Sequence, residues 1–182
     1  MSRSKITTTG VACVTVAFAA AVALSGTAHA VPDSRGVTLT CQDSTGKTWV
    51  TGGAGTLTSS DPGGTNPQKM KLASPMVAPI AIPANSLATV IRTVQTGAGA
   101  GTIRDFVGTV NPPMNVGNPI TLGAIPATAR LAAGTTVRLQ DTSAAAPSAT
   151  NWSMKINTTI SGSSVDIYCA GKQDAASGDF SF

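Results

Sequence analysis

The sequence predicts an all-β protein in which antiparallel strands form a single sandwich, and three observations lead to this prediction. Short segments alternate apolar and polar residues, as half-buried strands do. Glycine and proline, 19 and 11 of the 182 residues, separate these segments. Two segments near the ends of the chain, residues 37–41 and 165–169, each read apolar, polar, apolar, polar, cysteine. The pattern indicates about eight to ten short strands and no convincing helix.

The first thirty residues have the pattern of a secretory signal peptide. Arg3 and Lys5 give a positive start, residues 11–24 form an uncharged and largely apolar run, and a small-x-small site ends at Ala30. A membrane anchor is the alternative, but a spanning helix needs about 20 apolar residues and this run is shorter. We therefore expect residues 1–30 to be a signal peptide that is cut after Ala30, with no membrane span in the mature chain.

The chain after this leader has the size of one domain. Strand patterns continue to residue 170, so we expect residues 31–170 to form a single β-sandwich domain. Residues 171–182 are mostly polar and end in Phe-Ser-Phe. We expect them to form a polar C-terminal tail, either held on the surface or loose.

Strands in the first half of the chain are expected at residues 37–42, 47–51, 69–73 and 87–95. The period of two places Val37, Leu39 and Cys41 on one face of the first strand. The glycine-rich segment 52–55 is expected to loosen the backbone after the second strand. Three prolines in residues 74–84 restrict that segment to a sheet edge or an extended crossover, because proline has no N–H to donate.

Strands in the second half are expected at residues 102–110, 120–125, 135–141, 151–161 and 165–170. The segment 151–161 has the clearest alternation, with Trp152, Met154 and Ile156 on one face and hydroxyl, amide and lysine side chains on the other. Such a strand has one core face and one water face. Residues 142–150 are expected to form a linker-like loop.

Two cysteines remain after the leader is removed, Cys41 and Cys169. An even pair in an exported protein indicates a disulfide, so we expect an immunoglobulin-like β-sandwich whose first and last strands are joined by Cys41–Cys169. The two strands would be neighbours or would face each other across the core, with Cα atoms about 4.4 to 6.8 Å apart. Two free thiols, reactive or metal-binding, are the alternative.

Composition excludes several classes of function. The one histidine, His29, lies in the leader, and the chain contains no glutamate. A mature chain without His or Glu has no Ser-His-Asp triad, no Cys-His pair and no His-Glu zinc motif. Ten basic residues remain against eight aspartates, and they are scattered, so no nucleic-acid partner is expected.

No catalytic, cofactor-binding or metal-ligating residue stands out, and no cofactor is expected. Asp61, Asp105, Asp141 and Asp166 lie on separate segments, although an aspartate-dependent hydrolase would need two carboxylates close together. Residues 174–179 carry two aspartates, fewer than a calcium loop requires.

The aromatic residues are few, and two tryptophans are the largest. We expect Trp49 and Trp152 to pack in the core beside the disulfide, although a sugar-stacking platform is the alternative. Tyr168 would point to the surface, because it alternates with Cys169.

With the cysteine pair, the Val-Thr-Leu-Thr-Cys opening and the Ile-Tyr-Cys close, residues 37–170 resemble secreted β-sandwich domains of unknown function from actinobacteria. The segment Leu-Ala-Ala-Gly-Thr at residues 131–135 is also similar to strand-entry segments of the neocarzinostatin-type antibiotic carriers. Those carriers have two internal disulfides, whereas this chain has cysteines for one. Neither resemblance transfers a functional residue.

The sequence therefore favours a non-enzymatic protein, secreted or associated with the cell envelope, with a binding, adhesion or structural role. Its partner would be an extracellular or cell-envelope protein or glycan. A carrier of an apolar small molecule is the first alternative, and a pocket between the sheets would favour it. An aspartate-dependent hydrolase is the second.

Overall fold

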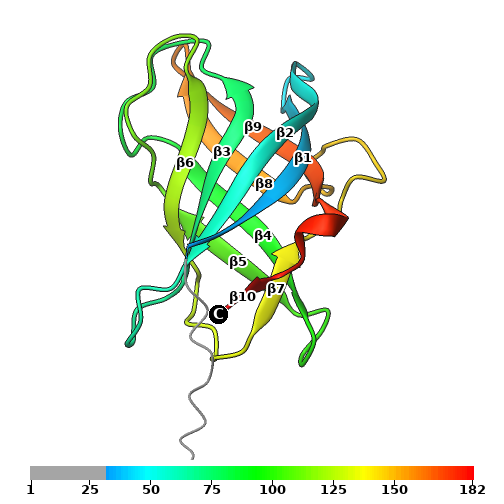
Figure 1. Cartoon of the computed structure of the whole chain (residues 1–182). Coiled ribbons are helices and arrows are strands. Elements are labelled where there is room, and N and C mark those ends of the chain that lie inside the picture. Colours follow the sequence, from blue (N-terminus) through cyan, green and yellow to red (C-terminus); the bar gives the residue numbers. More distant parts are fainter. Residues whose placement is uncertain (1–31) are drawn as a thin grey trace, which may run out of the picture.

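A computed structural model describes residues 32–182, which form ten strands and one short 3-10 helix (Figure 1). The elements in chain order are β1 (Asp33–Asp43), β2 (Thr48–Ser60), β3 (Lys69–Val77), β4 (Ala88–Thr96), β5 (Ile103–Gly108), β6 (Pro119–Pro126), β7 (Thr136–Leu139), β8 (Met154–Ile160), β9 (Ser163–Gln173), η1 (Ala175–Ser177) and β10 (Phe180–Ser181). The expected signal peptide, with its cut after Ala30, lies outside the described residues.

All ten strands belong to one antiparallel sheet. The strand order is β10-β7-β4-β8-β9-β1-β2-β3-β6, and β5 pairs with β4. The predicted all-β antiparallel class is confirmed. The immunoglobulin-like sandwich is not confirmed, because the strands follow one continuous hydrogen-bonded path.

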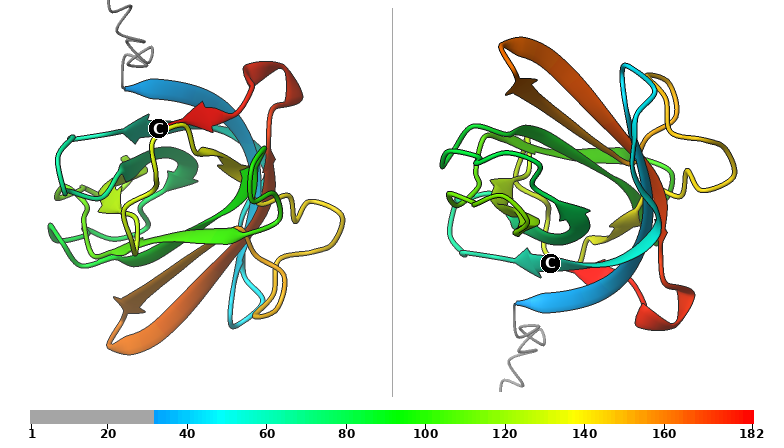
Figure 2. Two further views of the ribbon diagram at one scale, coloured as in Figure 1. Left: turned by 90° about the horizontal axis from the view of Figure 1, so that it is seen from below. Right: turned by 90° about the horizontal axis from the view of Figure 1, so that it is seen from above.

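The curled sheet closes on itself where β5, which branches from β4, meets the end of β6. Phe106 on β5 forms a bridge with Ala127, which directly follows β6, and the amide of Thr128 donates to the carbonyl oxygen of Asp105 at 3.0 Å. Figure 2 shows the strands arranged round an interior. The inward side of every strand can therefore pack against the same core.

The interior is filled by apolar side chains at alternate strand positions, as the period of two requires. Its largest fully buried members are Phe106, Phe180, Leu39, Leu57, Met70, Met76, Leu87, Ile91, Ile120, Leu122, Ile125 and Met154. Methionines help to fill such a core because their unbranched side chains adapt to irregular gaps.

The predicted disulfide is confirmed. Cys41 on β1 and Cys169 on β9 are paired directly across two neighbouring antiparallel strands, with Cα atoms 4.0 Å apart, just below the expected range. Both side chains are fully buried. The bond indicates an oxidising, extracellular environment.

The glycine-rich segment expected to loosen the chain is instead the middle of β2. β1 pairs with β2 along almost its whole length, with register shifts near Cys41. Gly53 is needed there because a Cβ atom at this position would lie 2.7 Å from Cβ of Pro75 on β3. Proline and glycine thus mark a close approach of two strands.

The segment expected to be a polar tail is part of the fold. β9 continues to Gln173, and β10 pairs with β7 through Phe180 and Val137. Phe180 is fully buried, and the ring of Phe182 lies 6.4 Å from that of Phe106. Burial of the two aromatic rings at the end of the core stabilises this segment. This stabilisation outweighs the preference of the neighbouring polar residues for water.

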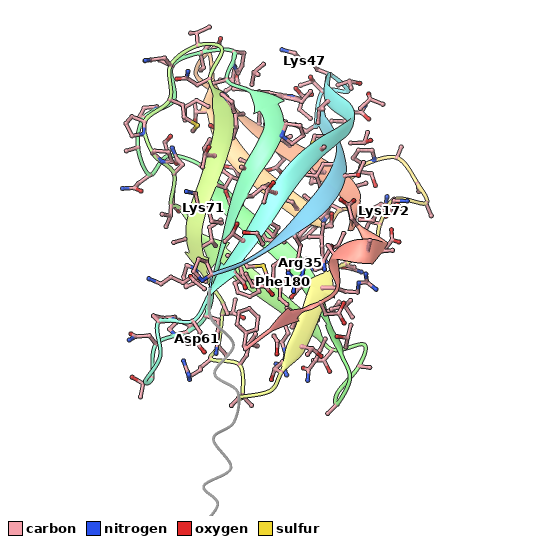
Figure 3. All side chains as sticks on the ribbon, viewed as in Figure 1. Arg35, Lys47, Asp61, Lys71, Lys172 and Phe180 are labelled. Atoms are coloured by element: carbon pink, nitrogen blue, oxygen red, sulfur yellow. A yellow bond between two sulfur atoms is a disulfide. The ribbon has the colours of Figure 1, made fainter. Side chains whose placement is uncertain are left out.

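Arg35 ties this C-terminal segment to β1. Its guanidinium donates to the carbonyl oxygens of Gly178 at 3.2 Å and Asp179 at 2.9 Å, and it lies 5.5 Å from the centre of the Phe180 ring (Figure 3). The carboxylate of Asp179 accepts a hydrogen bond from Thr96 at 2.6 Å. These contacts hold a strand of only two residues in place.

Candidate functional site

A groove runs along the outer side of β1 and β9. Leu39 and Cys41 point into the core, so the alternate residues Thr38, Thr40 and Gln42 point outward. The groove has a volume of about 430 Å3. It is lined by Thr38, Thr40, Gln42, Thr48, Thr51, Ser143, Ala144, Ala145, Ala146, Pro147, Ala170, Gly171 and Lys172.

The floor of the groove is low because the residue of β9 that faces outward there is an alanine. Ala170 pairs with Thr40, and Gly171 pairs with Leu39. A Cβ atom at Gly171 would lie 2.4 Å from the carbonyl oxygen of Thr38, so only glycine fits this close approach of two strands. Ala170 alternates with the core residue Cys169, so it presents only a methyl group to the outer side and leaves a hollow between its larger neighbours.

The loop between β7 and β8 forms the opposite wall, and side-chain hydrogen bonds hold its shape. The amide nitrogen of Asn151 donates to the carbonyl oxygens of Thr142 at 3.1 Å, Ala145 at 2.9 Å and Ala146 at 3.0 Å. The carboxylate of Asp141 accepts from the backbone amide and the hydroxyl of Ser143, at 3.0 and 2.7 Å.

Two further bonds attach this loop to the floor of the groove. The amide of Thr142 donates to the carbonyl oxygen of Gly171 at 2.9 Å, and the amide of Gly171 donates to the Thr142 hydroxyl at 3.1 Å. The wall is thus already formed before any ligand arrives, which lowers the ordering cost of binding.

The polar lining offers hydroxyl and amide groups. The Thr40 hydroxyl accepts from the amide of Gly52 at 3.0 Å and keeps its own proton to donate. The Gln42 amide nitrogen donates to the carbonyl oxygen of Gly46 at 3.0 Å, which leaves the side-chain oxygen as an acceptor. Thr48 and Thr51 are exposed on the neighbouring strand.

Lys172 is the only charged residue that lines the groove. Figure 3 places it where the end of β9 meets the β7–β8 loop. Hydrogen bonds from Ser143 lower the pKa of Asp141, and the charge of Lys172 lowers it further. The groove is therefore mostly neutral, with one cation at its end.

A polar network continues the same face beyond Gln42, which pairs with Tyr168. The Tyr168 hydroxyl donates to Asp166 at 3.1 Å, and the ammonium of Lys155 lies 3.1 Å from the same carboxylate. Burial raises the pKa of Tyr168, and the neighbouring Asp166 raises it further. Tyr168 therefore stays protonated and neutral at physiological pH, half-buried on the outer face as its alternation with Cys169 predicts.

The four aspartates considered for catalysis are engaged separately. Asp105 pairs with Arg92 at 3.1 Å and Asp61 pairs with Arg130 at 3.2 Å. A hydrogen bond from the backbone of Gly63 lowers the pKa of Asp61.

The other two aspartates also have lowered pKa values. For Asp141 the cause is Ser143, and for Asp166 it is chiefly the hydrogen bond from Asn157. A general acid needs a raised pKa, so these shifts do not support the hydrolase alternative.

The interior has little room for the ligand of an apolar carrier. An apolar hollow bordered by Trp49, Ile82 and Leu87 has a volume of about 10 Å3, no more than one water molecule needs. Residues 32–182 also contain no group of three or more His, Cys, Asp or Glu side chains that could hold a metal ion.

The two tryptophans lie in different environments. Trp49 packs partly against the core, as expected, and its indole N–H donates to Asp43 at 3.0 Å. Trp152 does not belong to the core cluster and has the guanidinium of Arg92 at 4.0 Å from its ring centre. The alternation that predicted a core position breaks before β8 begins, because Ser153 and Met154 are both buried.

No protein-family model, curated protein or solved structure matches this chain. No helix within residues 32–182 is long and apolar enough to cross a membrane.

Sequence reasoning missed the groove residues. Thr40 and Gln42 were recognisable as outward-facing, but Gly171 and Lys172 fell in the expected tail. The sequence of the 142–150 loop did not indicate a binding site. The shape of this loop depends on hydrogen bonds from the Asn151 side chain to three backbone carbonyl groups, which the sequence does not reveal.

Proposed function

We propose that this is a secreted or cell-envelope-associated, non-enzymatic binding protein that holds a glycan chain in the groove of β1 and β9. The observation that carries the proposal is a groove of about 430 Å3 with a preformed wall and a hydroxyl-rich lining. A sugar ring presents hydroxyl groups at its rim and C–H groups on its faces. Thr40, Gln42 and Thr48 suit the hydroxyls, and the alanines of the 143–147 wall suit the C–H faces.

The neutral lining favours an uncharged glycan over a strongly anionic one. Lys172 supplies a single cation, and the groove has no aromatic platform for stacking. Binding would depend on hydrogen bonds and on the fit of the groove, so each chain unit would bind weakly and several units would be needed.

Export is the second part of the proposal. It is supported by the leader pattern of residues 1–30 and by the disulfide. Mass spectrometry of the protein from culture medium should find Val31 as the first residue and no free thiol. Retention of residues 1–30 in the mature protein would contradict the export argument.

The groove predicts a specific binding defect. Ala145→Trp would fill the hollow, so binding to an array of neutral hexose oligosaccharides should fall at least about tenfold, the effect of 1.4 kcal/mol. Thr48→Val removes one exposed hydroxyl with little change in shape and should weaken binding by about three- to tenfold, as a single lost hydrogen bond does.

Matched controls separate the groove from the rest of the surface. Ala132→Trp adds the same bulk at an exposed alanine outside the groove, and Thr56→Val removes an exposed hydroxyl elsewhere on β2. Both controls should bind as the wild type does. Equal losses in Ala145→Trp and Ala132→Trp, or no bound glycan on the array, would show that the groove is not a glycan site.

A further inference from the structure

Two neighbouring loops at one end of the molecule carry no charge. Residues 72–91 and 106–129 contain no Asp, Glu, Lys or Arg, and they include the β3–β4 and β5–β6 loops. The two loops are joined by the Ile82↔Met114 bridge and by a hydrogen bond of 2.9 Å from the amide of Ala78 to the carbonyl oxygen of Asn118.

Large apolar side chains are exposed in and beside these two loops. Val77, Ile80 and Val116 are 56%, 38% and 66% exposed. Clustered exposed apolar residues in a protein of this size are typical of contact sites.

The edge of β8 is unpaired at the same end. Its pairing with β4 ends at Asn157 and Ala88, but β8 runs on to Ile160. Among the described residues, Thr158, Thr159 and Ile160 have a strand partner only in β9. Figure 2 shows the β8–β9 hairpin projecting away from the neighbouring strands.

A groove separates this free edge from the β3–β4 loop. It has a volume of about 190 Å3 and is lined by Ile80, Ala81, Ile82, Pro83, Ser86, Thr158 and Thr159. None of these side chains is charged, and two of the loop residues lie next to prolines that cannot donate hydrogen bonds. On the β8 side of the groove, residues 158–160 have a strand partner only in β9, so their other backbone edge faces this open space.

An apolar surface adjoins this groove. Trp49, Leu87 and Ile156 border it, and Ile80, Ile82 and Thr158 belong to both hollows. The hollow at this apolar surface has a free volume of only about 10 Å3. A side chain of a bound peptide would therefore lie on the surface, against Ile80 and Ile160, and would not enter the hollow.

We propose that the free edge of β8 is a docking site for an extended, uncharged peptide segment of a partner protein. An unpaired strand edge offers N–H and C=O groups at strand spacing, which selects an extended backbone. Alternate side chains of that segment would point toward the apolar surface beside Ile80. The uncharged walls favour a segment without charged residues, because a buried charge would lack a partner.

This site lies apart from the groove of β1 and β9, since the two share no lining residue. The docking proposal can therefore be tested without a glycan, and either proposal can fail alone.

The test is selection of a phage-displayed library of random 12-residue peptides on the purified, disulfide-bonded protein. We expect enrichment of uncharged peptides with alternating apolar and β-branched residues. Ile80→Asp should weaken binding of the enriched peptides at least tenfold. Ile103→Asp is the matched control, because Ile103 is similarly exposed, at 42%, but lies on β5, and it should leave binding unchanged.

A second variant tests the backbone contact. Thr159→Pro removes an N–H from the free edge and should also weaken binding at least tenfold. The circular dichroism spectrum of Thr159→Pro shows whether this variant folds. If Thr159→Pro does not fold, the Ile80→Asp variant still decides the test. Enrichment of charged peptides, equal binding to Ile80→Asp, or no enrichment would overturn the proposal. Binding of phosphatidylcholine vesicles that depends on Ile80, without peptide enrichment, would assign this end to lipid instead.

Discussion

Replacing both cysteines, Cys41→Ala with Cys169→Ala, is expected to lower the free energy of unfolding by several kcal/mol. The bond spans a sequence separation of 128 residues. In the chain-entropy description a crosslink of this length restricts the unfolded chain by about 5 kcal/mol, which is an upper figure. Because a small domain has about 5 to 15 kcal/mol in total, the loss should be large enough to leave part of the protein unfolded at 37 °C.

Urea unfolding followed by circular dichroism measures this effect. The wild type in the presence of reductant is the control, because it breaks the crosslink without removing side-chain atoms from the core. The reduced wild type and the double variant should both have much lower midpoints than the oxidised protein. Midpoints that coincide with that of the oxidised protein would mean that the bond contributes little to stability.

Phe180→Ala is expected to lower the free energy of unfolding by about 3 to 5 kcal/mol, the range for a large side chain removed from a core. Phe180 is fully buried although it is the third residue from the end of the sequence, and β10 has only two residues to hold it. The loss would open a cavity where β10, β7 and Arg35 meet. The cation–π contact with Arg35 would be lost as well.

Two neighbouring variants calibrate this prediction. Phe182→Ala removes a partly exposed ring and should cost less than Phe180→Ala, and Ser181→Ala should change the stability by less than about 0.5 kcal/mol. Thermal and urea unfolding of the three variants give the comparison. If Phe180→Ala is no more harmful than Ser181→Ala, the C-terminal segment does not contribute to the core.

The strands were the part of the fold that local sequence could predict. Alternation identified the segments that became β1, β8 and β9, and the two cysteines marked two strands that had to meet. The prolines of residues 74–84 predicted a sheet edge or a crossover, whereas β3 continues through Pro75 to Val77, with an irregular register against β6 between Ala73 and Val77. The extent of β2 could not be predicted, because its glycines are kept in a strand by pairing with β1 and not by their own preference.

The closure of the sheet and the fate of the C-terminus depend on contacts between distant segments. Phe106 meets Ala127, and Phe180 meets Val137, across large separations in sequence. A single polar stretch such as residues 171–179 gives no local sign that an aromatic residue beyond it enters the core.

The sequence by itself determined the all-β class, the crosslink between Cys41 and Cys169, and the absence of His and Glu from the chain after residue 30. These follow from composition and from a period of two, which are local properties. Only the tertiary structure decided where the groove and the free edge of β8 lie. Both arise where segments distant in sequence meet, and burial of the shared core fixes that arrangement.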